Sequence, residues 1–136
     1  MKKRIFLPVS LILFTMLGIS ASLKAQITWN YSQSVHNVDF YYCISTCGDE
    51  KVVFLKFVNN NAQNVSAGWK EIFSTQTEQG VPGYKGRKQV TLSPGITMQT
   101  DCESSSCTSC IARAKEEVPL YPAIINAFEF SDINVN

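Results

Sequence analysis

Residues 51–58 read KVVFLKFV, and this run decides the fold class. Successive side chains of a β-strand point to opposite faces, so the run predicts a strand with two distinct faces. One face carries Val53, Leu55 and Phe57. The other carries Val52, Phe54, Lys56 and Val58, and we expect it to be partly covered as well. Three asparagines at 59–61 follow and predict a turn, because Asn tolerates left-handed backbone conformations.

Further strand signals lie on both sides of this run. Only residues 111–118 (IARAKEEV) favour a helix, and the glycine-rich residues 78–88 are predicted to form a long loop. Six or seven short strands at a spacing of roughly 8–12 residues are typical of a two-sheet sandwich. The other predicted strands are residues 28–44, 65–75, 87–92 and 96–102, and a final strand at residues 123–130 and 133–135 that is interrupted in phase at residues 131–132.

Length and charge limit the classes of protein to which the chain can belong. Its 136 residues suit one domain. Residues 26–136 hold 8 basic and 11 acidic groups, a net charge of −3 (8 − 11), with no run of Lys or Arg. This balance argues against nucleic-acid binding. The single histidine, His36, lies in a polar stretch and is predicted to be on the surface.

Residues 1–25 have the three parts of a signal peptide. A basic start (residues 2–4, KKR) precedes a mostly apolar stretch at residues 5–19, and small and polar residues follow up to Ala25. The apolar stretch is too short to span a bilayer. We expect cleavage after Ala25, with Ala21 as the second choice, leaving residues 26–136 as one β-sandwich domain without a membrane span. The mature protein is then secreted or periplasmic, and the leader resembles those of exported Bacteroidetes proteins.

Part of the chain resembles immunoglobulin-like or fibronectin-like modules of exported bacterial proteins. The resemblance rests on residues 54–60 (FLKFVNN), on Trp69, and on residues 90–95 (VTLSPG). It implies an immunoglobulin-like antiparallel sandwich of about seven strands, in which Trp69 points inward and anchors the core. It also implies a module that binds, spaces or presents other molecules, with no shared catalytic residues.

Five cysteines are available for disulfides in an exported domain, and the odd number leaves at least one unpaired. Proximity favours a local bridge between Cys43 and Cys47, and another from Cys102 to Cys107 or Cys110. The sequence selects neither the connectivity nor the unpaired cysteine. It also leaves undecided whether the unpaired cysteine links two chains into a dimer.

Two other interpretations of the cysteines remain. Cys107 and Cys110 form a C-x-x-C pair just before the helix-prone stretch, where helix N–H groups lower a thiol pKa, so a thiol–disulfide protein is one alternative. The second alternative is a metal-handling protein, in which four of the cysteine thiolates bind zinc, or bind copper with the help of Met98. The carboxylate pairs at residues 49–50 and 116–117 adjoin turns and lysines and are predicted to face solvent.

The chain has more aromatic residues than one small core can bury, and several of them are predicted to form a binding surface. We expect a non-enzymatic binding, adhesion or structural module, with no catalytic residue, cofactor or metal site. Its partner would be a protein or glycan of the cell envelope. The aromatic residues in question are Trp29, Tyr41, Tyr42 and Tyr84, with Tyr31 and Tyr121 beside them.

Overall fold

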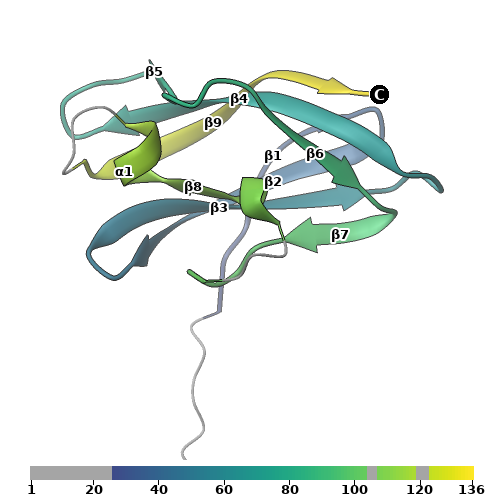
Figure 1. Ribbon diagram of the computed structural model, residues 1–136, viewed down its shortest axis with the longest axis horizontal. Coiled ribbons are helices and arrows are strands. Elements are labelled where there is room, and N and C mark those ends of the chain that lie inside the picture. Colours follow the sequence, from purple (N-terminus) through teal and green to yellow (C-terminus); the bar gives the residue numbers. More distant parts are fainter. Residues whose placement is uncertain (1–25, 104–106, 119–122) are drawn as a thin grey trace, which may run out of the picture.

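The computed structural model describes residues 26–103, 107–118 and 123–136, so the predicted leader and Tyr121 lie outside the described residues. Two antiparallel sheets form the described chain, with nine strands, one 3-10 turn and one four-residue helix. The predicted all-β sandwich is therefore confirmed, with nine strands where about seven are predicted. Figure 1 shows the sheets as two layers, one above the other.

Sheet A has β3 (Glu50–Asn59) as its central strand. β2 (Val38–Cys47) pairs with the whole of one edge of β3, and β1 (Asn30–Val35) pairs with β2. The other edge of β3 is shared by two short strands, which pair with its two halves. These are β7 (Gly95–Met98) and β8 (Ile111–Arg113).

Sheet B is built around β4 (Val65–Thr75). β9 (Ile125–Val135) pairs with one edge of β4, while β6 (Lys88–Leu92) and β5 (Val81–Pro82) share the other. The 3-10 turn η1 (Thr108–Cys110) and the helix α1 (Ala114–Glu117) flank β8 along the chain. In Figure 1, α1 lies at one end of the sandwich and η1 lies in front of the two layers.

The core fills the space between the sheets and is rich in aromatic rings. Trp69 on β4 is fully buried, and its ring lies 4.9 Å from that of Phe57 on β3. Phe40 and Phe57 meet edge to face at 5.3 Å, an arrangement that aromatic pairs prefer. The inward set predicted for residues 51–58 is confirmed, since Val53, Leu55 and Phe57 are fully buried.

The outer face of sheet A is covered over only part of its area. Val52 and Phe54 are buried there, and Ile27, Trp29, Cys102 and Ile111 pack around them. Lys56 and Val58, further along the same strand, are only half-buried. The prediction that this face is partly covered is confirmed.

Several segments differ from their predicted structure: the strand predicted at residues 96–102 ends at Met98, and the loop predicted at residues 78–88 contains β5. Residues 28–44 contain a hairpin rather than one strand, because His36 and Asn37 take φ angles of 45° and 60° and form a two-residue turn. His36 is exposed as predicted, and its Nδ1 lies 2.8 Å from the carbonyl oxygen of Val135. In residues 111–118 only Ala114–Glu117 is helical, since Ile111–Arg113 pairs with the edge of β3.

Across the described ranges, none of the helices has the length and apolar character needed to cross a membrane.

Candidate functional site

A row of side chains crosses the uncovered part of sheet A. Tyr31 lies opposite Tyr41, Tyr41 opposite Lys56, and Lys56 opposite Met98, so four neighbouring strands place these side chains on one face. Tyr31 and Met98 are 58% and 43% exposed, while Tyr41 and Lys56 are half-buried. The rings of Tyr31 and Tyr41 lie 5.4 Å apart, edge to face.

A second row runs beside the first and widens this surface. Asp39 lies opposite Val58, and Val58 lies opposite Ile96, which is 62% exposed. We call the two rows and the adjoining Trp29 the outer-face surface. Its members are Trp29, Tyr31, Asp39, Tyr41, Lys56, Val58, Ile96 and Met98.

Lys56 lies at the centre of this surface between two aromatic rings. Its Nζ is 4.4 Å from the centre of the Tyr41 ring and 5.3 Å from that of Trp29, within the range of cation–π attraction. No carboxylate of the described residues, which include every Asp and Glu of the chain, lies within 4.0 Å of this ammonium group. Asp39, the acid of the outer-face surface, accepts a hydrogen bond from Asn60 at 3.0 Å. A positive charge therefore remains available among the aromatic rings.

The four aromatic residues predicted to bind lie in three different places. Trp29 and Tyr41 belong to the outer-face surface. Tyr42 points to the opposite side of sheet A, with its ring 5.3 Å from Phe128 and in contact with the core. Tyr84 is 81% exposed in the loop between β5 and β6, near α1 rather than near sheet A's outer face, and its N–H donates to the carbonyl oxygen of Glu117.

Sequence reasoning missed five members of the surface, namely Asp39, Lys56, Val58, Ile96 and Met98. The alternation of residues 51–58 places Lys56 on the outer side, but nothing local shows that aromatic rings flank it. Ile96 and Met98 belong to the outer-face surface only because β7 pairs with β3, and these two segments lie far apart in the chain.

The cysteines pair differently from the predicted local bridges. Disulfides join Cys47 to Cys102 and Cys107 to Cys110, and Cys43 is a free, half-buried thiol whose pKa is raised by burial. The expected Cys43–Cys47 bridge is wrong because β2 continues through Cys47. Four residues of strand separate two Cα atoms by about 13 Å, beyond the roughly 7 Å that a disulfide spans. The expected link from Cys102 to Cys107 or Cys110 is wrong as well.

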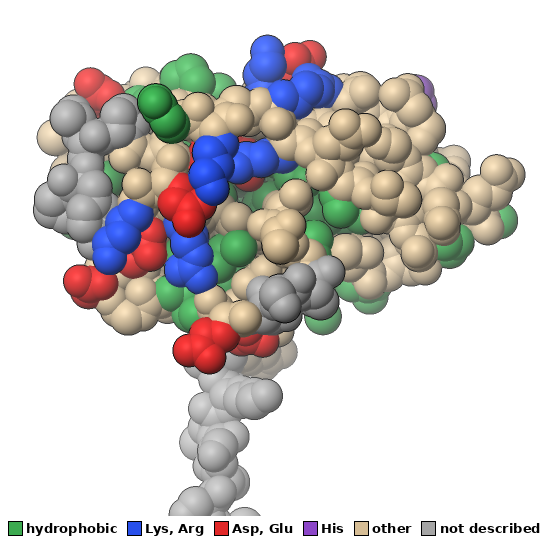
Figure 2. Space-filling view, viewed as in Figure 1, with side chains coloured by type: hydrophobic (Ala, Val, Ile, Leu, Met, Phe, Trp, Pro, Cys, Tyr) green, Lys and Arg blue, Asp and Glu red, His purple; other side chains and the backbone are tan. Residues whose placement is uncertain are grey.

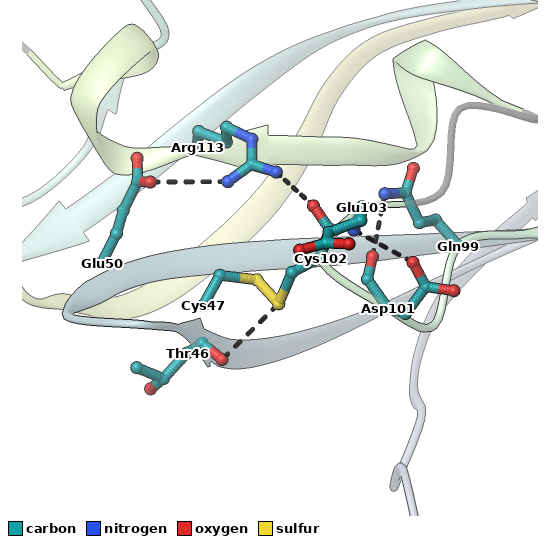
Figure 3. The surroundings of a disulfide bond; sticks show 8 residues. All are labelled: Thr46, Cys47, Glu50, Gln99, Asp101, Cys102, Glu103 and Arg113. Carbon is teal, nitrogen blue, oxygen red and sulfur yellow. Dashed lines mark hydrogen bonds and ion pairs between the residues drawn. A yellow bond between two sulfur atoms is a disulfide. The ribbon is translucent and has the colours of Figure 1, made fainter.

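The Cys47–Cys102 disulfide ties the end of β2 to the segment after β7 (Figure 3). Beside it, Arg113 donates to the carbonyl oxygen of Cys102 at 2.5 Å and lies 3.5 Å from a carboxylate oxygen of Glu50. Glu50 also accepts a hydrogen bond from the N–H of Lys115 at 3.0 Å. Glu50 is buried, so its predicted exposure is wrong, whereas its neighbour Asp49 is exposed.

The Cys107–Cys110 disulfide lies in the main core. Cys107 is 7% exposed and Cys110 is fully buried, and both pack with residues of the inner sheet faces. Cys107 precedes the short 3-10 turn, and α1 begins only at Ala114, so the predicted α-helix N-terminus beside these cysteines is not found in the described residues.

A buried pair of carboxyl groups closes one end of the sandwich. Glu71 lies between Trp69 and Phe73 on the inner face of β4, and the Trp69 indole N–H donates to it at 3.3 Å. Lys88 Nζ is hydrogen-bonded to Glu117 and lies 4.0 Å from the other oxygen of Glu71. Burial raises the pKa of Glu71 to about 7.

Glu117 is fully buried within this cluster, so its predicted exposure is wrong, although Glu116 is exposed as expected. Figure 2 shows the adjoining surface, where Lys and Arg side chains alternate with Asp and Glu near α1, β8 and β6. These exposed groups pair with one another, as Lys85 does with Glu116. Most charges of this face are thus compensated by ion pairs within the face, whereas Lys56 has no such partner among the described residues.

Metal ligands do not gather in the described residues, where no group of three or more His, Cys, Asp or Glu side chains is placed to hold an ion. Comparison of the chain with protein-family models, with curated proteins and with solved structures finds no match.

Proposed function

We propose that this chain is an exported, non-enzymatic binding or adhesion module, and that its outer-face surface holds the ligand. The observation that carries the proposal is Lys56, a cation without a carboxylate partner between the rings of Tyr41 and Trp29. Such a site suits a partner with a flat apolar face and an acidic group. The expected partner is therefore an acidic glycan or an acidic protein segment of the cell envelope.

Export is supported by two features of the chain. Residues 1–25 have the pattern of a cleaved leader. Four of the five cysteines lie in disulfides, which persist in oxidising compartments such as the periplasm and the extracellular space.

The immunoglobulin-like form of the sandwich is also part of the proposal. Two antiparallel sheets enclose one core, and Trp69 points inward from the central strand of sheet B. The turn at residues 92–95 carries the chain from β6 of sheet B to β7 of sheet A. A rigid sandwich with a flat, uncovered face suits presentation of a binding surface.

The alternative, a thiol–disulfide or metal-handling protein centred on Cys107 and Cys110, has less support. A reactive disulfide needs an accessible sulfur in surroundings that stabilise the thiolate. Both sulfurs belong instead to the apolar core. Their burial supports a stabilising role.

Binding to defined polymers tests the proposal. The probes are alginate and poly-L-glutamate as acidic polymers, with dextran as the uncharged one. We expect an acidic polymer to bind, with affinity that falls as salt rises, and we expect Tyr41→Ala and Lys56→Met each to weaken binding by at least about ten-fold. Tyr84→Ala is the matched control, because it removes a more exposed tyrosine outside the surface. Equal weakening by Tyr84→Ala, or no binding to either acidic polymer, would contradict the proposal.

A further inference from the structure

The edge of β2 is covered by β1 along only part of its length. The paired positions run from Val35 opposite Val38 to Asn30 opposite Tyr42. β2 continues to Cys47, so within the described chain its residues after Tyr42 have no strand beside them on this edge. An unpaired strand edge readily accepts another extended chain.

The main-chain groups of Ile44 and Thr46 point toward this open edge. Val35 and Val38 flank the two-residue turn and exchange main-chain hydrogen bonds across it. In an antiparallel pair every second residue points its N–H and C=O groups the same way, so the even-numbered residues of β2 face the β1 side. In agreement, Asn30 donates through its side-chain amide to the carbonyl oxygen of Tyr42 at 3.4 Å.

Neither Ile44 nor Thr46 has a main-chain partner on this side among the described residues. Sulfur atoms lie beside their carbonyl oxygens, Cys43 Sγ at 3.7 Å from Ile44 O and Cys102 Sγ at 3.9 Å from Thr46 O, and the Cys102 sulfur, being in a disulfide, has no hydrogen to donate. Figure 3 shows Thr46 beside the Cys47–Cys102 disulfide at this edge. The edge thus offers main-chain donors and acceptors at every second residue.

A groove of about 650 Å³ runs along the same edge. The consecutive residues 42–46 form one wall and Asn126 and Ala127 of β9 form another, while Ile27 and Phe54 add apolar surface. Among the described residues that line it there is no Asp, Glu, Lys, Arg or His. This lack of charge contrasts with the net charge of −3 carried by residues 26–136.

We propose that this groove binds an uncharged, extended peptide segment of a partner protein, which adds a strand to sheet A at the open edge of β2. Strand addition supplies main-chain hydrogen bonds to Ile44 and Thr46, and the alternating side chains of the segment fit the apolar walls. A lipid or a sugar lacks main-chain groups at the spacing of about 6.6 Å, two residues of a strand, that this edge presents. The groove is separate from Lys56, so this proposal does not depend on ligand binding at the outer-face surface.

The free thiol of Cys43 makes the proposal testable, because it lines the groove and the other four cysteines are in disulfides. The probe is the blocked peptide acetyl-Thr-Val-Thr-Val-Cys-amide, offered as its disulfide with 2-mercaptoethanol under reversible exchange. In an antiparallel pair with its Cys opposite Cys43, its two valines lie opposite Ile44 and Thr46. Attack by the Cys43 thiolate joins the peptide to the protein and releases 2-mercaptoethanol. The control peptide is identical except for N-methyl groups on the two valines, whose N–H groups would face β2. A Cys43→Ser chain controls for capture at other cysteines.

We expect at least about ten-fold greater capture of the unmethylated peptide, because only this peptide can donate both main-chain hydrogen bonds. We also expect slower hydrogen exchange at the N–H groups of Ile44 and Thr46 in the adduct. Equal capture of the two peptides, including no capture of either, would overturn the proposal. Unchanged exchange at Ile44 and Thr46 in the adduct would also overturn it, whatever the outcome for variants at Lys56.

Discussion

At the scale of single residues, Glu71 is the least expected feature of the core. Its carboxyl group shares the space between the sheets with Trp69 and Phe73, and one of its oxygens has no hydrogen-bond partner among the described residues. Two buried carboxyl groups, Glu71 and Glu117, adjoin one half-buried ammonium group, that of Lys88. Ionisation of Glu71 therefore adds a second negative charge where only one is compensated, and desolvation makes that charge costly.

The pH dependence of stability follows from this arrangement. The pKa of Glu71 is about 7 in the folded protein against 4.5 for an ordinary Glu. Between these pH values the folded chain keeps a proton that the unfolded chain has released, so stability falls as pH rises from about 4.5 to about 7 and then levels off. We predict that Glu71→Gln, which cannot ionise, matches the natural chain at pH 5. At pH 8 it should be more stable by up to about 3 kcal/mol.

Urea unfolding of both chains between pH 5 and pH 8.5 measures this difference. Glu116→Gln is the matched control, because Glu116 is exposed and its pKa is lowered by its hydrogen bond to Lys85. Its contribution is complete above the ordinary pKa of Glu, so it should show no change over this range. A Glu71→Gln chain whose advantage stays constant with pH would contradict the account of the cluster.

At the scale of elements, the β1–β2 hairpin depends on backbone conformations that few residues adopt. His36 and Asn37 both lie in the left-handed region, and the turn sets the register of the hairpin from Val35 to Gln33. A β-bulge between Gln33 and Tyr31 then shifts the register by one residue and brings Tyr31 beside Tyr41. We predict that Asn37→Gly is neutral or slightly stabilising, whereas Asn37→Val lowers the free energy of unfolding by about 1–2 kcal/mol, because a β-branched residue is strained there. Thermal unfolding followed by circular dichroism would decide this, and equal midpoints for the two variants would argue against the turn.

The Cys47–Cys102 disulfide links two elements separated by 55 residues. In the chain-entropy model a loop of this length is worth about 4 kcal/mol, because the cross-link restricts the unfolded chain. We predict that the double variant Cys47→Ala with Cys102→Ala loses about 2–4 kcal/mol of unfolding free energy. Guanidinium denaturation without reductant measures the loss, and an unchanged free energy of unfolding would show that the bridge is not formed in the folded protein.

Thiol counting checks the disulfide pattern independently. The chain is alkylated in denaturant without reductant, and the intact mass is then measured. We predict one alkylated cysteine, Cys43, and five after reduction. Three or five alkylated cysteines before reduction would contradict the two bridges and would strengthen the case for redox or metal chemistry.

At the scale of the whole molecule, local patterns predict the strands, and non-local pairing decides the site. The alternation in residues 51–58 is enough to identify the inward face of β3, because burial follows directly from the period of a strand. The same pattern cannot show that residues 111–113 would pair with β3 instead of joining a helix, or that β2 extends through Cys47. Both outcomes depend on which edges the folded chain leaves open. The burial of Glu71 and Glu117 could not be predicted either, because the lysine that compensates their charge, Lys88, comes from a different strand, β6.

The outer-face surface combines both kinds of information. Trp29 and Tyr41 are recognisable in the sequence as aromatic residues in excess of the needs of one core. Their place beside Lys56 depends on the pairing of β2 with β3, and on the stretch before β1 crossing the outer face of sheet A. Together they leave one uncovered, cationic and aromatic area on a sandwich whose other charges are mostly paired.

The most direct test of the proposed function uses the two tryptophans, which give separate indole N–H signals in a nitrogen–proton NMR spectrum. Trp29 is half-buried beside Lys56, whereas Trp69 is fully buried between the sheets. Titration with the acidic polymer that binds should shift the Trp29 indole signal and the main-chain signals of Tyr41 and Lys56, while the Trp69 indole signal stays in place. Saturable binding that leaves the Trp29 signal unchanged would contradict the assignment of this face as the binding surface.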